Sequence, residues 1–297
     1  MFPIVPANSA ASFTENDEGI FAYGGGAASA IYQQSNLVSN AGVVSTDVAG
    51  VGSGRYASTG CEYGEDKGII GYGEITGTKV SMTNLVSNTG VVSTDVTGVG
   101  TDRSIMAACE YGGDKGIFGY GDTAGPNTAV TNLVTNAGVV GTDVTGVGTA
   151  RRGLGACEYG GDKGIFGFGS AGGNTAVTNL VTNAGVVGTD VTGVGTARAY
   201  MSACSYGGDK GIFAKGPYSN LVSNAGVVAT DVAAVGTQRY DTGACEYGGD
   251  KGIFGFGNTG GGETSITNLI SNAGVMASDQ AATTGTARDY PGACSFN

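Results

Sequence analysis

Short apolar stretches recur along the whole chain, and each is bounded by glycine, asparagine or aspartate. Segments such as GIFGYG, NLVSN, GVVSTDV and AACEYG are rich in β-branched and aromatic residues, which is typical of β-strands. No window places apolar residues at the i, i+3, i+4, i+7 spacing of an amphipathic helix over three turns. The pattern therefore predicts an all-β protein and excludes helical solenoids.

These stretches belong to one repeat, which reads NLVTNAGVVGTDVTGVGTARRGLGACEYGGDKGIFGFG from Asn132 to Gly169. Successive cysteines of the repeat are 48, 48, 47, 41 and 49 residues apart. A period of about 40 to 50 residues is that of a propeller blade or a helical repeat, and four short strands per repeat match a blade. The period of about nine residues of a calcium-binding β-roll does not fit.

Glycine alternates with bulky residues in the aromatic strand GIFGYG. Glycine weakens a strand unless a ring or another backbone packs close to it. Because neighbouring blades stack face to face, we expect Gly119 to leave room for a ring from the next blade.

The two ends of the chain hold complementary parts of one repeat. The first recognisable strand, Gly19 to Gly24, is an aromatic strand, and the chain ends on a cysteine strand, Gly292 to Asn297. Pairing of these strands would remove exposed sheet edges. The sequence thus predicts a six-bladed β-propeller of four-stranded blades over residues 17–297, closed by its N- and C-terminal strands. Residues 1–16 match no repeat, and we interpret them as an arm: a docking segment, or else a frayed terminus or a cover over the propeller.

Composition narrows the classes of partner. The chain has 297 residues with 58 Gly, 5 Pro and a net charge of −11. An acidic chain lacks the basic footprint of a nucleic-acid-binding protein and is not attracted to anionic lipid. There is no apolar run long enough to span a membrane and no signal-peptide pattern at the start. We therefore expect no nucleic-acid partner and no membrane insertion.

The six cysteines occupy the same place in successive repeats. Equivalent positions in a ring point the same way and lie apart, so their geometry is poor for disulfides. We expect buried free thiols and synthesis in a reducing compartment. The cysteines are Cys61, Cys109, Cys157, Cys204, Cys245 and Cys294.

Catalytic chemistry finds little support. The chain has no His, which removes Ser-His-Asp arrangements and most zinc or copper sites. Glu62, Glu110, Glu158 and Glu246, with Ser205 and Ser295, fall on the strand expected to be innermost; that they line a central channel and hold water or a cation is the alternative to a purely structural role. No repeat carries a unique pair of acids for glycoside cleavage. We predict no enzyme activity, no cofactor and no metal.

An aspartate and an arginine recur in every repeat. They are interpreted as a partly buried charge pair that fixes blade register, with ligand binding by the arginine as the alternative. The residues are Asp47, Arg55, Asp95, Arg103, Asp143, Arg151, Asp190, Arg198, Asp231, Arg239, Asp279 and Arg288.

The loops of a propeller alternate between its two faces. The loops from first to second strand (YGGDKG) and from third to fourth (SNAGVVSTD) are nearly identical among repeats, and we call their side the constant face. The remaining loops differ in every repeat and form the variable face. A scaffold that carries a binding face would show this contrast, and neutral drift of exposed loops is the alternative. Tyrosine and arginine are common interface anchors, so the candidate binding residues are Tyr56, Arg152, Tyr200, Met201, Tyr218, Tyr240 and Tyr290.

The repeat resembles two known groups of proteins. AACEYGGDKGIFGYG, from Ala107 to Gly121, is similar to the first two strands of a kelch repeat, although the chain lacks the tryptophan of that family. The sequence segments YGGDK, IFGYG, TNLVSN and GTAR resemble those of glycine-rich repeat proteins of aquatic bacteriophages and other viruses. This resemblance implies a non-enzymatic virion protein made in the host cytoplasm. It would be a tail- or fibre-associated propeller that contacts other virion proteins through residues 1–16 and binds a glycan or protein of the host surface. A capsid decoration protein and a free lectin-like module are the alternatives.

Overall fold

The computed structural model describes residues 17–26, 30–281 and 285–296. The described residues form several small antiparallel sheets and contain no helix. The predicted all-β class is therefore confirmed. The predicted arm, residues 1–16, lies outside the described residues.

Six of the sheets share one strand order, in which the cysteine strand pairs with the aromatic strand and the aromatic strand pairs with the NLV strand. In that order they are β21 (Gly292–Phe296), β1 (Glu18–Gly26) and β2 (Ala30–Val38); β3 (Thr59–Tyr63), β4 (Lys67–Gly71) and β7 (Thr83–Val86); β8 (Ala107–Tyr111), β9 (Lys115–Gly119) and β10 (Thr131–Val134); β11 (Gly155–Tyr159), β12 (Lys163–Gly167) and β13 (Thr178–Val181); β14 (Ser202–Tyr206), β15 (Lys210–Lys215) and β16 (Tyr218–Val222); β18 (Gly243–Tyr247), β19 (Lys251–Gly255) and β20 (Thr267–Ile270).

The fourth segment of each repeat departs from the expected four-stranded blade. Among the described residues, only the sheet of β14 to β16 gains a fourth strand, β17 (Val232–Ala233), and a separate hairpin is formed by β5 (Glu74–Ile75) and β6 (Thr78–Lys79). Elsewhere the fourth segment makes isolated bridges, such as Thr131 with Val144. Three glycines and an aspartate in GTDVTGVGT disfavour a regular strand, and the aspartate side chain makes its hydrogen bonds to other segments.

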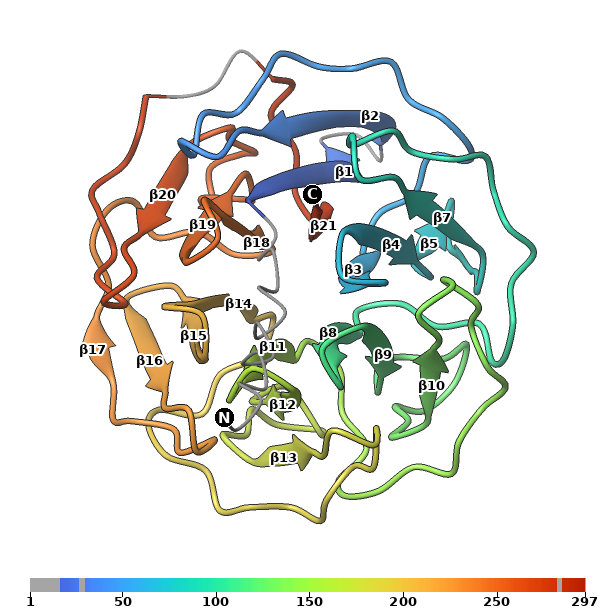
Figure 1. Cartoon of the computed structure of the whole chain (residues 1–297), viewed down its shortest axis with the longest axis vertical. Coiled ribbons are helices and arrows are strands. Elements are labelled where there is room, and N and C mark those ends of the chain that lie inside the picture. Colours follow the sequence, from blue (N-terminus) through green and yellow to red (C-terminus); the bar gives the residue numbers. More distant parts are fainter. Residues whose placement is uncertain (1–16, 27–29, 282–284, 297) are drawn as a thin grey trace, which may run out of the picture.

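The sheets follow one another around a common centre, with the cysteine strands innermost (Figure 1). Each cysteine strand contacts the next along the chain, and β21 contacts both β18 and β3. β21 also pairs antiparallel with β1, with Cys294 opposite Ile20, so the predicted pairing between the two ends of the chain is present.

Neighbouring sheets pack through the aromatic strand. An added Cβ on Gly119 would lie 2.7 Å from Cζ of Phe166 in the neighbouring sheet. The space that we expected Gly119 to leave for a ring is therefore present. The same contact joins the sheets near the chain ends, where a Cβ on Gly255 would lie 2.8 Å from Cζ of Phe21.

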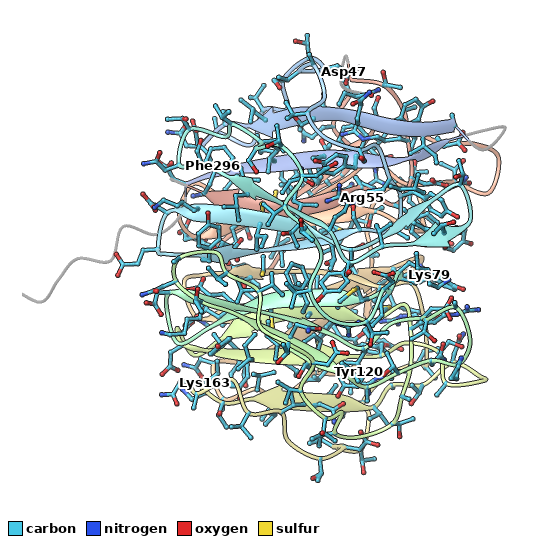
Figure 2. The ribbon with its side chains drawn as sticks, turned by 90° about the vertical axis from the view of Figure 1, so that its right-hand side faces the viewer. Asp47, Arg55, Lys79, Tyr120, Lys163 and Phe296 are labelled. Carbon is cyan, nitrogen blue, oxygen red and sulfur yellow. The ribbon has the colours of Figure 1, made fainter. Side chains whose placement is uncertain are left out.

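The two sets of loops lie on opposite sides of the molecule. In the side view of Figure 2, Lys163 of a GGDK turn and Lys79 of a loop between second and third strands lie toward opposite faces. On the constant face, Asn136 donates to the Asp114 carboxylate at 3.0 Å. This bond connects two loops that are nearly identical among the repeats. On the variable face, Tyr56 and Glu74 form a bridge between two variable loops.

Candidate functional site

The six repeated arginines are buried structural residues. Arg151 donates from Nε to the Phe168 carbonyl at 2.8 Å and from Nη2 to Oδ1 of Asn179 at 2.7 Å. Its guanidinium also lies 4.4 Å from the centre of the Tyr120 ring, a favourable cation–π distance. All six arginine side chains are buried, so they are not available to a ligand.

The repeated aspartates do not pair with the arginine of their own repeat. Each lies close to the arginine of the preceding repeat, and two pairs reach salt-bridge distance, Arg198 with Asp231 at 3.2 Å and Arg288 with Asp47 at 4.0 Å. In the other four the opposite charge acts at longer range. These are Arg55 with Asp95, Arg103 with Asp143, Arg151 with Asp190 and Arg239 with Asp279.

The main partners of the aspartates are hydroxyl and amide groups. Asp190 accepts from the Thr149 hydroxyl at 2.6 Å, from the Thr149 amide at 3.1 Å and from Nδ2 of Asn179 at 2.9 Å. Burial alone would raise the pKa of Asp190, but these hydrogen bonds and Arg151 lower it on balance. Asp190 and its equivalents are therefore ionised carboxylates that hold neighbouring repeats together through hydrogen bonds, a contact that we call the clasp.

The structure brings together only part of the predicted binding set. The Tyr290 ring lies 6.3 Å from the Tyr56 ring and 6.4 Å from the Tyr200 ring, both edge to face. Met201 is buried and lines the same cavity as Tyr200 and Tyr290. Tyr240 belongs to the rim of this group, because the Lys215 ammonium lies between its ring and that of Tyr200, at 5.2 and 5.3 Å.

Two predicted binding residues make their contacts elsewhere. Arg152 forms a salt bridge with Asp122 at 3.2 Å, next to Lys79. Tyr218 packs its ring 5.6 Å from the Arg198 guanidinium. These contacts explain both residues as parts of the loop structure.

Tyr200 and Tyr290 belong to a ring of six equivalent positions, each two residues after a repeated arginine. All six residues have positive φ, between 50° and 65°, a conformation that is uncommon for residues other than glycine. Main-chain hydrogen bonds link several neighbours, for example Tyr200 N to Gly153 O at 2.7 Å and Tyr290 N to Asp241 O at 2.8 Å. The ring residues, which we call the axial ring, are Ala57, Ile105, Gly153, Tyr200, Asp241 and Tyr290.

The axial ring lines one cavity of about 100 Å³ where the six cysteine strands meet. Asp241 lies between Tyr200 and Tyr290 in ring order, and Tyr290 hydrogen-bonds its carboxylate. Burial and the nearby Asp289 raise the pKa of Asp241, Tyr290 and Lys215 oppose the rise, and the resulting pKa is about 7. Oδ1 of Asp241 is buried and makes no hydrogen bond in the structure. The cavity is thus lined by a carboxylate-bearing residue and two tyrosines.

Sequence reasoning missed Asp241, Ile105 and Lys215. The signal was present, because the second position after the arginine differs in chemical class in nearly every repeat. Lys215 is also the only residue in its column that is not aromatic, since the other repeats place Tyr or Phe there. The variable position after the arginine and the exceptional Lys215 were both overlooked because the candidate binding residues were chosen by residue type.

A second, smaller cavity of about 30 Å³ lies among the cysteines and Glu62, Glu246 and Ser205. Burial raises the pKa of Glu62 and of Glu110, and for Glu110 the other channel glutamates add to the rise. The Ser295 amide donates to the Glu62 carboxylate at 2.8 Å. Among the residues that the structure describes, no group of three or more His, Cys, Asp or Glu is arranged to hold a metal ion.

The six cysteines are buried and unpaired, as predicted. Burial raises the pKa of each thiol, which is the opposite of the activation that a catalytic thiol needs. Within the described part of the chain there is no helix that could span a membrane. Comparison of the chain with protein-family models and with curated proteins gives no match.

Proposed function

We propose that the six sheets are the blades of a closed six-bladed β-propeller. The neighbour contacts among the cysteine strands and the pairing of β1 with β21 support this arrangement. A closed ring has no long exposed sheet edge, so it gives six sets of variable loops a common rigid base.

We propose that the protein is a non-enzymatic binding protein that recognises a glycan or a protein through the centre of its variable face. The observation that carries the proposal is the axial ring. Its backbone conformation is the same in six repeats, yet its side chains differ in size, polarity and charge. Strained conformations of this kind cluster at ligand sites, and loops on a rigid scaffold carry function more often than the scaffold itself.

The experiment compares the whole protein with two variants on a glycan array and against candidate partner proteins. The double variant Tyr200→Asn and Tyr290→Asn removes two rings, and asparagine tolerates positive φ. The control, Val139→Thr, changes a side chain on the constant face that is 61% exposed. We expect the double variant to lose binding and the control to keep it, and equal binding by all three proteins would refute the proposal.

We further propose that the protein works on a virion, as a tail- or fibre-associated component. This placement rests on the resemblance of its repeats to glycine-rich viral repeat proteins. If residues 1–16 dock the propeller to other virion proteins, their deletion will abolish incorporation into particles and spare ligand binding. A capsid decoration protein would be incorporated without any binding by the variable face, and a free lectin-like module would not be found in particles.

A further inference from the structure

The two halves of the axial ring differ in their chemistry. Ala57, Ile105 and Gly153 form a small and apolar half, whereas Tyr200, Asp241 and Tyr290 form an aromatic and acidic half. In a repeat protein, residues that all copies share serve the scaffold. The three contiguous positions that depart toward aromatic and acidic chemistry are therefore the best candidates for recognition of a ligand.

Negative charge exceeds positive charge around this half. The charged groups that act on Asp241 are Asp289 and Lys215. Asp289 is itself partly buried, which raises its pKa, and the negative charge of Glu263 raises it further. At the other end of the tyrosine group, the Tyr56 hydroxyl donates to Oε1 of Glu74 at 2.5 Å, and the Lys79 ammonium lies 3.6 Å from the other oxygen of Glu74. A cationic group would balance this charge better than a neutral or anionic one.

The protein already shows how these rings accommodate an ammonium group. The Lys215 ammonium lies over the rings of Tyr200 and Tyr240 and donates to the Ala199 carbonyl. Tyr200 also makes an edge-to-face contact with Tyr290 and lines the axial cavity. Aromatic faces attract cations within about 6 Å of the ring centre, and a carboxylate with a free oxygen supplies a charge-assisted hydrogen bond.

We propose that the axial cavity binds a primary ammonium group of the partner, between Tyr200 and Tyr290 and beside the carboxylate of Asp241. This inference rests on the proposed binding role of the variable face and names the chemistry that it recognises. The cavity of about 100 Å³ is smaller than the roughly 300–1,000 Å³ of a drug-sized site, so it suits the end of a side chain or one substituent of a sugar. A lysine side chain and an amino sugar both carry such a group.

Two matched pairs of probes test the chemistry on the full-length protein by titration calorimetry. The first pair is N-acetyl-lysine methylamide and N-acetyl-norleucine methylamide, and the second is glucosamine and N-acetylglucosamine. We expect the charged member of at least one pair to bind and its neutral counterpart not to bind. The pair that responds identifies the source of the ammonium group, and equal behaviour of charged and neutral probes in both pairs would overturn the proposal.

The variant Asp241→Asn tests the carboxylate. Asp241 has a φ of 57°, which asparagine adopts readily, so the variant should fold. We expect it to weaken ammonium binding by at least about tenfold, the usual scale for losing a charged hydrogen bond. The control Asp102→Asn removes the same charge from an exposed position and should leave the affinity unchanged.

A second readout uses pH. The lysine probe keeps its charge up to about pH 10, whereas Asp241 ionises near pH 7 under the influence of Tyr290, Lys215 and Asp289. The affinity for that probe should rise between pH 6 and pH 8 in the wild type and stay flat in Asp241→Asn. An identical profile in the two proteins would contradict the role of Asp241.

Failure of this inference differs from failure of the proposed function. If a glycan or protein partner binds the wild type and loses binding in the double tyrosine variant, while Asp241→Asn binds it normally, the variable face is a binding face but not an ammonium site. If the double tyrosine variant keeps all binding, the proposed function itself fails.

Discussion

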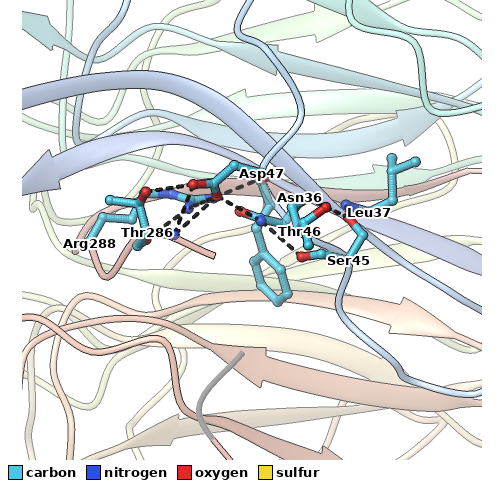
Figure 3. Close-up of polar contacts among 8 residues, drawn as sticks. Asn36, Leu37, Ser45, Thr46, Asp47, Thr286 and Arg288 are labelled. Carbon is cyan, nitrogen blue, oxygen red and sulfur yellow. Dashed lines mark hydrogen bonds and ion pairs between the residues drawn. The ribbon is translucent and has the colours of Figure 1, made fainter. Parts of the chain in front are cut away.

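Asp47 and Thr286, 239 residues apart in sequence, form a hydrogen-bonded clasp (Figure 3). The Thr286 hydroxyl donates to the Asp47 carboxylate at 2.5 Å, and the Thr286 amide donates to both of its oxygens at 3.1 Å. The same clasp recurs within the chain, for example between Asp143 and Thr101 and between Asp231 and Thr196. The contact that ties the beginning of the chain to its end is therefore one copy of the contact that ties each repeat to the next.

The clasp makes the stability of the protein sensitive to acid. Burial would raise the pKa of Asp231, but hydrogen bonds from Thr196 and Asn220 and the charge of Arg198 lower it to about 2. Since the unfolded value is about 3.9, the clasp contributes fully above about pH 4 and its contribution is lost as the pH falls toward 2. We expect Asp231→Asn to lower the free energy of unfolding by about 1–2 kcal/mol at pH 7. Chemical denaturation should show this difference shrinking at pH 2.5, and a difference that is constant with pH would contradict the assignment.

Arg151 and Arg152 form a matched pair of neighbours with opposite roles. Arg151 is fully buried and its guanidinium holds three acceptors, whereas Arg152 is half-exposed in a surface salt bridge. Lysine cannot reproduce the planar fork of arginine. We expect Arg151→Lys to cost about 3 kcal/mol and Arg152→Lys to cost less than about 0.5 kcal/mol, both measured by urea denaturation. Similar losses in the two variants would show that the buried network is not what stabilises the repeat.

Much of the fold could be predicted because the same local sequence pattern occurs in six repeats. Glycine, asparagine and aspartate mark the turns, and the split repeat predicts the pairing of β1 with β21. The pairing of charges could not be predicted. Asp143 and Arg151 lie close in sequence, yet Arg151 faces Asp190, because the side chain of Asp143 turns to Thr101 of the preceding repeat. Such register between repeats depends on three-dimensional packing that one sequence does not contain.

The candidate site was predictable only in part for a similar reason. Three tyrosines that residue type suggested, Tyr56, Tyr200 and Tyr290, do lie together. Asp241 was overlooked because an aspartate in a variable loop reads as a solvated charge, and only the positive φ and the burial of the axial ring give it another meaning. Comparing the six copies position by position, instead of searching for favoured residue types, is the procedure that would have found it.

The thiols give a direct test of the packed centre. Burial raises the pKa of all six, and the thiolate is the reactive form. We expect no thiol to react with Ellman's reagent in the native protein at pH 8 and all 6 cysteines to react after unfolding. The variant Val139→Cys, at a position that is 61% exposed, should add one rapidly reacting thiol. Rapid labelling of the wild type would show that the centre opens readily.

The contact between Gly119 and Phe166 predicts both a loss and its repair. A methyl group on Gly119 would overlap the Phe166 ring, so we expect Gly119→Ala to cost about 1–3 kcal/mol of stability. Two other repeats place alanine at the equivalent position: Ala22 packs in one cluster with Ile70, the counterpart of Phe166, and Ala214 packs in one cluster with Phe254. A smaller facing side chain is therefore one way in which the chain accommodates the methyl group.

Changing the facing residue as well should therefore restore part of the loss. We expect the double variant Gly119→Ala, Phe166→Ile to lose less free energy of unfolding than the sum of the losses of the two single variants. The favourable coupling should be about 0.5–2 kcal/mol. Gly125→Ala serves as the control, because its added Cβ would have only the Thr123 hydroxyl within reach, at 3.9 Å. Urea denaturation of the four proteins of the cycle measures the coupling. Simple additivity would mean that the glycine is kept for a reason other than the ring of the neighbouring sheet.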